Sequence, residues 1–391
     1  MKRAVIIADD LSGANDVGCK VFENGFKCAA VDASKQALLR FLKIYKGIPI
    51  INTASRMLSS ASAYKAVYAA AFPLRKYGLI YKKLDSTLRG NIGAELDACI
   101  DALKIRAVAL VPAFPELKRR TIYGRHFLNG KVLENTEYAH DPVNRLETSD
   151  IFTLLKQQSK NSSILVDIDI IRQGADAVNK FINSKRISSP VIFYFDCINN
   201  SDMRIIAESL KDFKVIAGAS ALAGYVFPKK RRIVSVYPKT NKGNVYLVGS
   251  VKDITHRQVS KLSSLQTIPV FPVLSNIRFK AGTKDLILSV KMIRKAGNTK
   301  MRRKIEAAFR RNAVELVNKL KYGRLFITGG ATAEIIFKAL KINYTEIKDV
   351  LFAGVPLTYS PERNIYVVTK PGGFGDADAL LKIHARLKIL K

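Results

Sequence analysis

The segment LIYKKLDSTLRGN, from Leu79 to Asn91, places an apolar run directly before a dense polar turn. Leu79–Lys83 has the length and apolar character of a buried strand, and Gly90–Leu103 has the period of an amphipathic helix. A strand, a polar turn and a helix are the first part of a βαβ unit, whose strands run parallel. The segment therefore predicts an α/β fold.

The same alternation of short apolar runs and helical segments continues along the chain. Further strands are expected at Ala4–Ala8, Ile48–Ile51, Ala107–Val111, Ile164–Val166, Val191–Phe195, Val245–Val248, Asp285–Val290 and Leu325–Thr328. Further helices are expected near Gly13–Glu23, Ser59–Lys76, Ile171–Ile182, Asp202–Lys211, Asp253–Leu262, Thr299–Leu320 and Ala331–Leu340. Pro112–Asn144 interrupts the alternation and is expected to be a long excursion, a kind of segment that is often functional.

The chain has 391 residues, which at roughly 100–200 residues per domain predicts two domains. A basic, proline-containing stretch favours a linker that separates a domain at 1–228 from one at 243–391. With 48% hydrophobic and 25% charged residues, the composition excludes a disordered or collagen-like chain. The cysteines stand singly and no apolar run is long enough to span a membrane, so we expect a cytoplasmic protein with reduced thiols.

The formal net charge of +33 would attract nucleic acid, anionic membranes or small anionic substrates. The strongest local basic segment is Lys291–Arg311, which contains nine Lys and Arg residues and one acid, Glu306. Such runs without interleaved aromatic residues more often form solvated faces than nucleic-acid platforms. We therefore do not expect nucleic acid as a partner, although the charge alone leaves that alternative open.

Two carboxylates, Asp9 and Asp10, follow the first strand and precede a helix. In open α/β sheets, ligands bind outside the carboxyl ends of the strands. Adjacent carboxylates at that place can hold a substrate hydroxyl, accept its proton or bind a divalent cation. The alternative is that Asp9 or Asp10 only caps the next helix.

The polar turn that begins at Lys83 contains cations, a carboxylate, hydroxyls and one amide within ten residues, which suits an anionic, hydroxylated ligand. The residues in question are Lys83, Asp85, Ser86, Arg89 and Asn91, and Arg56 would add a further cation at the same sheet edge. In a purely structural alternative, Ser86 caps a helix and Arg89 pairs with Glu95.

Three glycine-containing turns follow strands in the second half of the chain. They are Gly249-Ser250, Gly329-Gly330-Ala331-Thr332 and Lys370-Pro371-Gly372-Gly373. Glycine lets the backbone approach a ligand closely, and the free N–H groups of a helix start favour phosphate. Together, these turns predict a nucleotide phosphate site.

The ordered set of motifs resembles the four-carbon acid sugar kinase family over nearly the whole chain. The matching segments are Asp9–Ala14, Lys83–Asn91, Pro112–Pro115, Arg120-Thr121, His140–Pro142, Gly249-Ser250 with Thr255 and Gln258, Thr328–Ala333 and Lys370–Gly375. The resemblance implies that the N-terminal domain binds a sugar acid such as threonate, erythronate or 3-oxo-tetronate. It also implies that the C-terminal domain binds ATP, with transfer to the terminal hydroxyl in the cleft between two α/β domains with mainly parallel sheets.

Roles follow from the resemblance together with the chemistry of phosphoryl transfer. Asp10 or Asp85 is expected to orient the acceptor hydroxyl and take its proton, and Lys83 with Arg56 to anchor the substrate carboxylate. Other contacts with the acid are expected from Asp9, Ser86, Arg89 and Asn91. Nucleotide contacts are expected from Ser250, Gly329, Gly330, Ala331, Thr332, Lys370, Gly372 and Gly373. Mg²⁺ is expected to accompany ATP, with Asp376 and Glu334 as candidate ligands and no firm assignment.

Three other functions stay open at this point. The chain could phosphorylate another small hydroxy acid, or it could bind nucleotide and sugar acid as a sensor without turnover. The third function is binding of nucleic acid. A homo-oligomeric assembly is compatible with each of these functions. The identity of the acid is not determined by these motifs.

Overall fold

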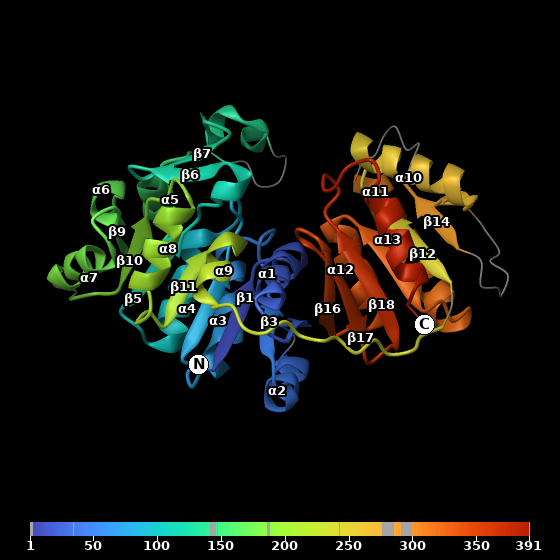
Figure 1. Ribbon diagram of the computed structural model, residues 1–391, viewed down its shortest axis with the longest axis horizontal. Coiled ribbons are helices and arrows are strands. Elements are labelled where there is room, and N and C mark those ends of the chain that lie inside the picture. The colour runs from blue at the N-terminus through green and yellow to red at the C-terminus, as the bar shows by residue number, and fades with distance from the viewer. Residues whose placement is uncertain are drawn as a thin grey trace. The chain divides into compact units, whose positions relative to one another are not determined.

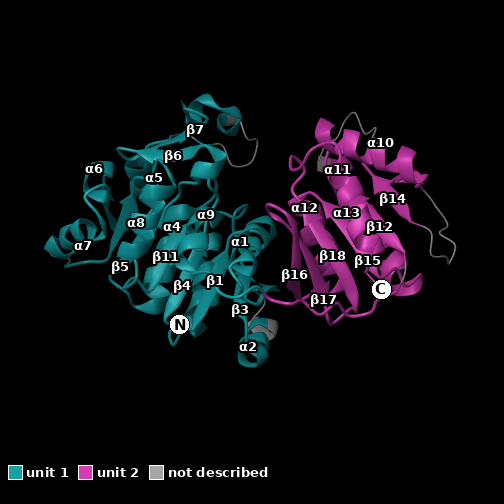
Figure 2. Ribbon diagram, viewed as in Figure 1, with its two compact units in different colours: residues 1–232 teal, residues 233–391 magenta. Residues whose placement is uncertain are grey.

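The computed structural model describes residues 3–33, 35–140, 146, 148–185, 188–241, 243–275, 285–290 and 299–390. The chain divides into two compact units, Met1–Arg232 and Ile233–Lys391 (Figure 2). Each unit contains a sheet with helices packed against it (Figure 1). The predicted α/β class is confirmed.

The first unit is built on a parallel sheet with the strand order β2-β3-β1-β4-β11-β5-β10-β9. Its strands are β1 (Ala4–Ala8), β2 (Cys28–Asp32), β3 (Ile48–Asn52), β4 (Leu79–Lys83), β5 (Ala107–Val111), β9 (Ser162–Val166), β10 (Val191–Phe195) and β11 (Val215–Gly218). The strands β2 and β11 were not expected, because CAAVD contains a single β-branched residue and VIAG is only four residues long and ends in Ala-Gly.

Helices form two layers in this unit. One layer contains α1 (Leu11–Glu23), α6 (Ile168–Ile171), α7 (Ala175–Ser184), α8 (Asn200–Ser209) and α9 (Ser220–Val226). The other contains α3 (Ser60–Ala71), α4 (Ile92–Leu103) and α5 (Ile151–Gln158), while α2 (Lys35–Ile44) contacts β2. The crossover from β1 runs to one side of the sheet and that from β4 to the other, so α1 and α4 lie on opposite faces.

Two expected helices are shorter than their apolar period indicates. The helix expected at Ser59–Lys76 ends at Ala71, and a 3₁₀ turn containing Pro73 follows it. The helix expected at Ile171–Ile182 begins only at Ala175, because Ile171 ends α6 and Gly174 has a φ of 105° that is incompatible with an α-helix.

The excursion after β5 contains a small antiparallel sheet of β6 (Arg119–Ile122), β7 (Arg125–Leu128) and β8 (Lys131–Val132). The turn residues Tyr123 and Gly124 both have positive φ, as do Asn129 and Gly130. Two-residue turns of that kind match the twist of the strands they join. The 3₁₀ turns η2 (Pro115–Leu117), η3 (Leu133–Asn135) and η4 (Glu137–His140) complete the segment, and the motif residues Asp141 and Pro142 lie outside the described part of the chain.

The second unit has the strand order β13-β14-β12-β15-β18-β17-β16, parallel as far as β18 and antiparallel beyond it. The strands are β12 (Asn244–Val248), β13 (Val270–Pro272), β14 (Leu286–Ser289), β15 (Arg324–Thr328), β16 (Tyr344–Phe352), β17 (Val355–Ser360) and β18 (Ile365–Lys370). The antiparallel strands β16 and β17 were not expected.

Two pairs of helices pack against this second sheet. The helices α10 (Asp253–Gln266) and α13 (Ala379–Lys388) contact each other, as do α11 (Thr299–Val314) and α12 (Gly330–Leu340). The expected helix Thr299–Leu320 ends as a π-helical segment, Glu315–Lys319, and the basic residues 291–298 lie outside the described residues. Within the described ranges, none of the helices is both long and apolar enough to cross a membrane.

The buried side chain of Asn24 connects the ends of α1 and α9. Its Nδ2 donates to the carbonyls of Gly224 at 2.7 Å and Phe227 at 2.5 Å, at the C-terminus of α9. Because carbonyls at a helix C-terminus lack intrahelical donors, we expect Asn24→Ala to lower the free energy of unfolding by about 1–3 kcal/mol in urea denaturation. Asn183→Ala, at an exposed site of α7, is the control, and an equal loss in both variants would contradict this role.

Candidate active site

The parallel register aligns the turns that follow three neighbouring strands of the first unit. Ala8 of β1 pairs with Asn52 of β3 and with Lys83 of β4. The turns that begin at Asp9, Thr53 and Leu84 therefore emerge at the same sheet edge. Because α1 and α4 leave this edge toward opposite faces, the edge has the topology at which α/β sheets bind ligands.

Arg56 joins the two carboxylates that follow β1. Its Nε and Nη2 donate to the two oxygens of Asp9, each at 2.8 Å, and its Nη1 lies 2.6 Å from Asp10 Oδ2. The side chain of Asp10 also caps α1, because its Oδ1 accepts from the N–H of Gly13 at 2.5 Å. Asp10 therefore has the capping role of the structural alternative as well as a charged partner. In this structure Arg56 is directed at carboxylates of the chain, so its contact with a sugar acid stays a prediction.

The two carboxylates differ in exposure and in acidity. The side chain of Asp9 is 4% exposed and that of Asp10 is 21% exposed. Burial would raise the pKa of Asp9, but Arg56, Lys82 and Lys83 outweigh it and lower the pKa. Burial raises the pKa of Asp10, Arg56 opposes that change, and the charge of Asp9 adds to it. Asp10 is therefore the better proton acceptor of the two.

Asp85 is held as an anion in the turn after β4. It accepts hydrogen bonds from the amide and hydroxyl of Thr87, at 3.3 and 3.1 Å, and pairs with Arg89. Burial would raise the pKa of Asp85, but Arg56, Arg89 and Lys83 together hold it well below its usual range. Such a carboxylate is a weak base, so the geometry favours an orienting role for Asp85.

The other predicted residues of this turn have different surroundings. Lys83 is buried, and its Nζ donates to the Leu84 carbonyl at 2.6 Å and lies 3.9 Å from Asp16. Asn91 donates to the carbonyls of Ser55 and Leu58, so it fixes the turn that carries Arg56. The structural alternative for Ser86 and Arg89 is wrong: the residue at the N-cap of α4 is Asn91, and Arg89 pairs with Asp85.

The structure adds two residues that the sequence did not single out. Arg119 of β6 donates to the hydroxyl of Ser86, whereas the motif residue Arg120 is exposed. His126 of β7 is buried between the Thr121 hydroxyl and the Ser86 carbonyl, at 2.9 and 3.0 Å, and burial lowers its pKa to about 4. Their spacing from Ser86 in the sequence gives no signal, because only the hairpin brings them to this turn.

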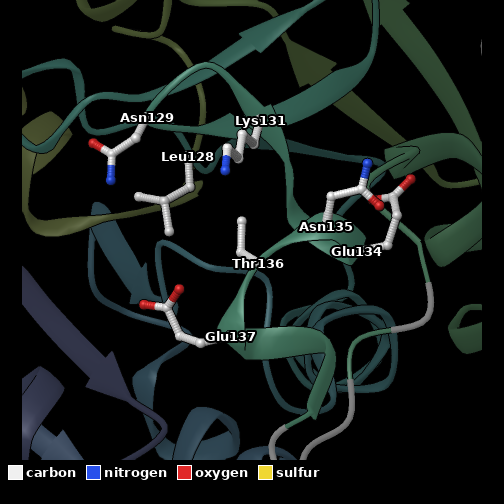
Figure 3. A pocket seen from close by; sticks show the side chains of 7 residues that line it. All are labelled: Leu128, Asn129, Lys131, Glu134, Asn135, Thr136 and Glu137. Carbon is white, nitrogen blue, oxygen red and sulfur yellow. The ribbon is translucent and has the colours of Figure 1, made fainter.

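A polar pocket of about 680 Å³ lies in the segment of β7, β8 and η3 (Figure 3). It is lined by Leu128, Asn129, Lys131, Glu134, Asn135, Thr136 and Glu137, none of which is a predicted site residue. The next residue, Tyr138, has the guanidinium of Arg89 5.0 Å above its ring centroid. The segment therefore reaches the polar turn through a cation–π contact.

Gly13 has no room for a side chain beside the two carboxylates. A Cβ there would lie 2.8 Å from Asp10 Oδ1 and 3.4 Å from Asp9 Oδ1. Alanine normally stabilises a helix relative to glycine by roughly 0.5–1 kcal/mol. We expect Gly13→Ala instead to lower the free energy of unfolding by about 1 kcal/mol, because the Asp10 cap must move.

Gly224→Ala is the matched control in urea denaturation, since nothing lies within 4 Å of a Cβ at that helical position. This variant should be as stable as the wild type or more so. If Gly13→Ala were equally well tolerated, the Asp10 carboxylate would not be confined as described.

In the second unit, the turns after β12, β15 and β18 lie at the carboxyl ends of adjacent parallel strands. Gly249 and Gly372 are required by close packing, because a Cβ on Gly249 would collide with Thr332 and one on Gly372 with Ser250. Gly329 has a φ of 99° and precedes the first residues of α12, Gly330 to Thr332. The structure thus brings all predicted nucleotide residues of this unit to one edge.

The loop after β18 is held by donors to its carbonyl groups. Thr255 Oγ1 donates to Gly372 O at 2.7 Å, and Gln258 Nε2 donates to Asp376 O at 2.7 Å. Lys370 is buried, and its Nζ lies within 3.4 Å of the carbonyl oxygens of Pro371, Gly372 and Phe374. The ammonium of Lys370 therefore braces the loop, and a direct contact with phosphate stays a prediction.

The described residues contain no group of three or more His, Cys, Asp or Glu side chains that could hold a metal ion. Asp376, a candidate ligand, pairs with Lys382 at 2.8 Å and accepts from the Asp378 amide. Glu334 of α12, the other candidate ligand, already interacts with another group of the protein. These residues do not form a preassembled metal site.

Lys370 predicts a pH effect on stability. Burial lowers its pKa to about 8, whereas a lysine in the unfolded chain titrates near about 10.4. Between these values the unfolded chain holds a proton that the folded chain has lost, so stability rises with pH. Lys370→Met removes this titrating group and serves as the reference. We expect the free energy of unfolding of the wild type, relative to that of Lys370→Met, to rise by up to about 3 kcal/mol from about pH 8 to about pH 10.4. A difference that does not change over this range in urea titrations would contradict the buried state of Lys370.

Residues 4–226 match a family described as a sugar-binding N-terminal domain, and residues 281–380 match one described as a nucleotide-binding C-terminal domain. Among curated proteins, the chain is similar to a D-erythronate kinase of Heliobacterium modesticaldum, with 28% identity over 97% of this chain and 95% of that protein. A D-threonate kinase of Salmonella typhimurium is 25% identical over 97% of this chain and 96% of that protein.

Among solved structures, the Haemophilus influenzae protein HI1011 superposes with a TM-score of 0.81. The match covers 98% of this chain and all of that chain, at 22% sequence identity. The two proteins therefore share the fold over both units.

Proposed function

The chain belongs to the four-carbon acid sugar kinase family, and we propose that it transfers the γ-phosphoryl group of ATP to the terminal hydroxyl of a four-carbon sugar acid. The sugar acid would bind at the sheet edge of the first unit and the nucleotide at the glycine turns of the second. Erythronate, threonate and 3-oxo-tetronate are the first acids to consider, because relatives that match nearly the whole chain carry those three names.

The observation that carries the proposal is the contrast among the carboxylates of the first unit. Cationic partners lower the pKa values of Asp9 and Asp85, whereas the pKa of Asp10 is raised by burial and by the charge of Asp9 although Asp10 also contacts Arg56. A kinase needs a carboxylate that accepts the proton of the acceptor hydroxyl, and others that orient groups. We assign the first role to Asp10.

The remaining roles follow from charge and position. Lys83 would bind the substrate carboxylate, with Arg119 and Ser86 as further contacts from β6 and the polar turn. Arg56 would keep Asp10 oriented toward the acceptor, because its guanidinium already contacts that carboxylate. In the second unit, the N-terminal amides of α12 and the backbone of the Gly372 loop would receive the phosphates. Mg²⁺ would arrive on the phosphates of ATP, and no role above depends on a metal held by the protein.

ADP release with Mg-ATP tests the proposal directly. The panel is D- and L-threonate, D-erythronate, 3-oxo-tetronate, glycerate and a reaction without acid. Turnover on a four-carbon acid would support the proposal and identify the substrate. Turnover on glycerate alone would favour a kinase of another hydroxy acid, and absence of both turnover and ATP binding would refute the proposed function.

Asp10→Asn tests the general base. Asparagine keeps the shape and can still cap α1, so the fold should be retained, but it cannot accept a proton. We expect kcat to fall about 10²–10⁴-fold, while the variant still unfolds cooperatively at a melting temperature lowered by the loss of the contact between Asp10 and Arg56. Asp176→Asn, at an exposed site in α7, is the control and should have wild-type kcat. Near-normal turnover of Asp10→Asn would remove Asp10 from this role.

A further inference from the structure

A lysine and a glutamate are buried in contact with each other in the first unit. Lys82 of β4 is 0% exposed and Glu95 of α4 is 1% exposed, and Lys82 Nζ lies 2.6 Å from Glu95 Oε2. Lys82 Nζ also lies 3.1 Å from the carbonyl of Lys83. Neither Lys82 nor Glu95 has a role in the function proposed above.

The second oxygen of Glu95 begins a chain of short oxygen–oxygen contacts. Glu95 Oε1 lies 2.5 Å from Ser55 Oγ, which lies 2.8 Å from Thr53 Oγ1. Thr53 Oγ1 in turn lies 2.9 Å from the carbonyl oxygen of Ala8, the last residue of β1. Ser55 is 0% exposed and Thr53 is 8% exposed.

Counting hydrogens along this chain constrains the state of Glu95. The three contacts need three hydrogens, and the hydroxyls of Ser55 and Thr53 supply only two. The carbonyl of Ala8 can only accept. If Glu95 is ionised, one of the three contacts joins two oxygens with no hydrogen between them. If Oε1 of Glu95 carries a proton, Glu95 can donate to Ser55, Ser55 to Thr53 and Thr53 to the Ala8 carbonyl, so every contact has its hydrogen.

The surrounding charges agree with this arrangement. Burial raises the pKa of Glu95, Lys82 opposes the change, and the nearby charge of Asp9 adds to it. The ammonium of Lys82 also interacts with Asp9. If Glu95 is neutral, the positive charge of Lys82 balances the negative charge of Asp9. If Glu95 is ionised, two buried carboxylates share the charge of Lys82.

We propose that Glu95 is a protonated positioning residue, whose donation through Ser55 and Thr53 to the Ala8 carbonyl fixes the turn that carries Arg56. Ser55 directly precedes Arg56, and the Arg56 amide donates to the Asp9 carbonyl at 3.2 Å. The chain thus ties the backbone at the end of β1 to the turn whose guanidinium orients Asp9 and Asp10. The effect on turnover rests on the proposed function, while the protonation state does not.

The test compares Glu95→Gln with Glu95→Ala. The amide of glutamine can donate to Ser55 and accept from Lys82, so it reproduces a protonated carboxyl group. We expect the unfolding equilibrium constant of Glu95→Gln to stay within about tenfold of wild type, and that of Glu95→Ala to rise by more than about a hundredfold. Glu208→Gln, at an exposed site of α8, is the control and should match the wild type.

A Glu95→Gln variant as unstable as Glu95→Ala would overturn the proposal, because an ionised Glu95 would then be the partner of Lys82. The infrared difference spectrum of wild type minus Glu95→Gln at pH 7 provides an independent readout. A band of a protonated carboxyl group is expected in this difference spectrum. A spectrum that contains carboxylate bands and no such band would overturn the proposal.

If the kinase function holds, Glu95→Gln should also keep wild-type kcat. Both stability and spectrum can be read even if no acid in the panel is phosphorylated.

Discussion

The contact of one guanidinium, that of Arg56, with both Asp9 and Asp10 is the interaction on which the site of the first unit depends. Two adjacent carboxylates at a buried strand end would repel each other and lose their hydration. Arg56 compensates both, with two hydrogen bonds to Asp9 and one contact to Asp10. Two contacts of the neighbouring residue Ser55 hold Arg56 in this position. Asn91 donates a hydrogen bond to the Ser55 carbonyl, and the hydroxyls of Ser55 and Thr53 contact each other.

The candidate sites of the two units differ in the groups that they stabilise, which are carboxylates in the first unit and backbone carbonyls in the second. The first unit compensates buried carboxylates with Arg and Lys side chains, so that individual carboxylates acquire different acidities. The second unit shapes a loop with neutral backbone groups, which Thr255, Gln258 and Lys370 hold through its carbonyl oxygens. Carboxylates of different acidity suit proton transfer, and a closely packed glycine loop suits contact with phosphate, as the two halves of a phosphoryl transfer require.

Much of the fold could be predicted because buried parallel strands are apolar runs with polar turns at their carboxyl ends. Asp9, Asp85 and Gly329 were predicted in this way to follow strand ends, and the structure places them there. The strand β2 was missed because CAAVD carries little β propensity, and β11 was missed because VIAG is only four residues long. Arg119 and His126 were missed because a hairpin, and no spacing in the chain, brings them to Ser86.

The sequence by itself determined the α/β class, the order of the turns and the kinds of side chain that each turn offers, because these depend on local periodicity and on the residues that follow each strand. The tertiary structure decided which cation meets which carboxylate. Arg89 pairs with Asp85 and Lys82 with Glu95, and Arg56 binds both Asp9 and Asp10. Such partners are selected by the register of neighbouring strands and by burial, which makes an uncompensated charge costly, and neither quantity can be read from the order of residues.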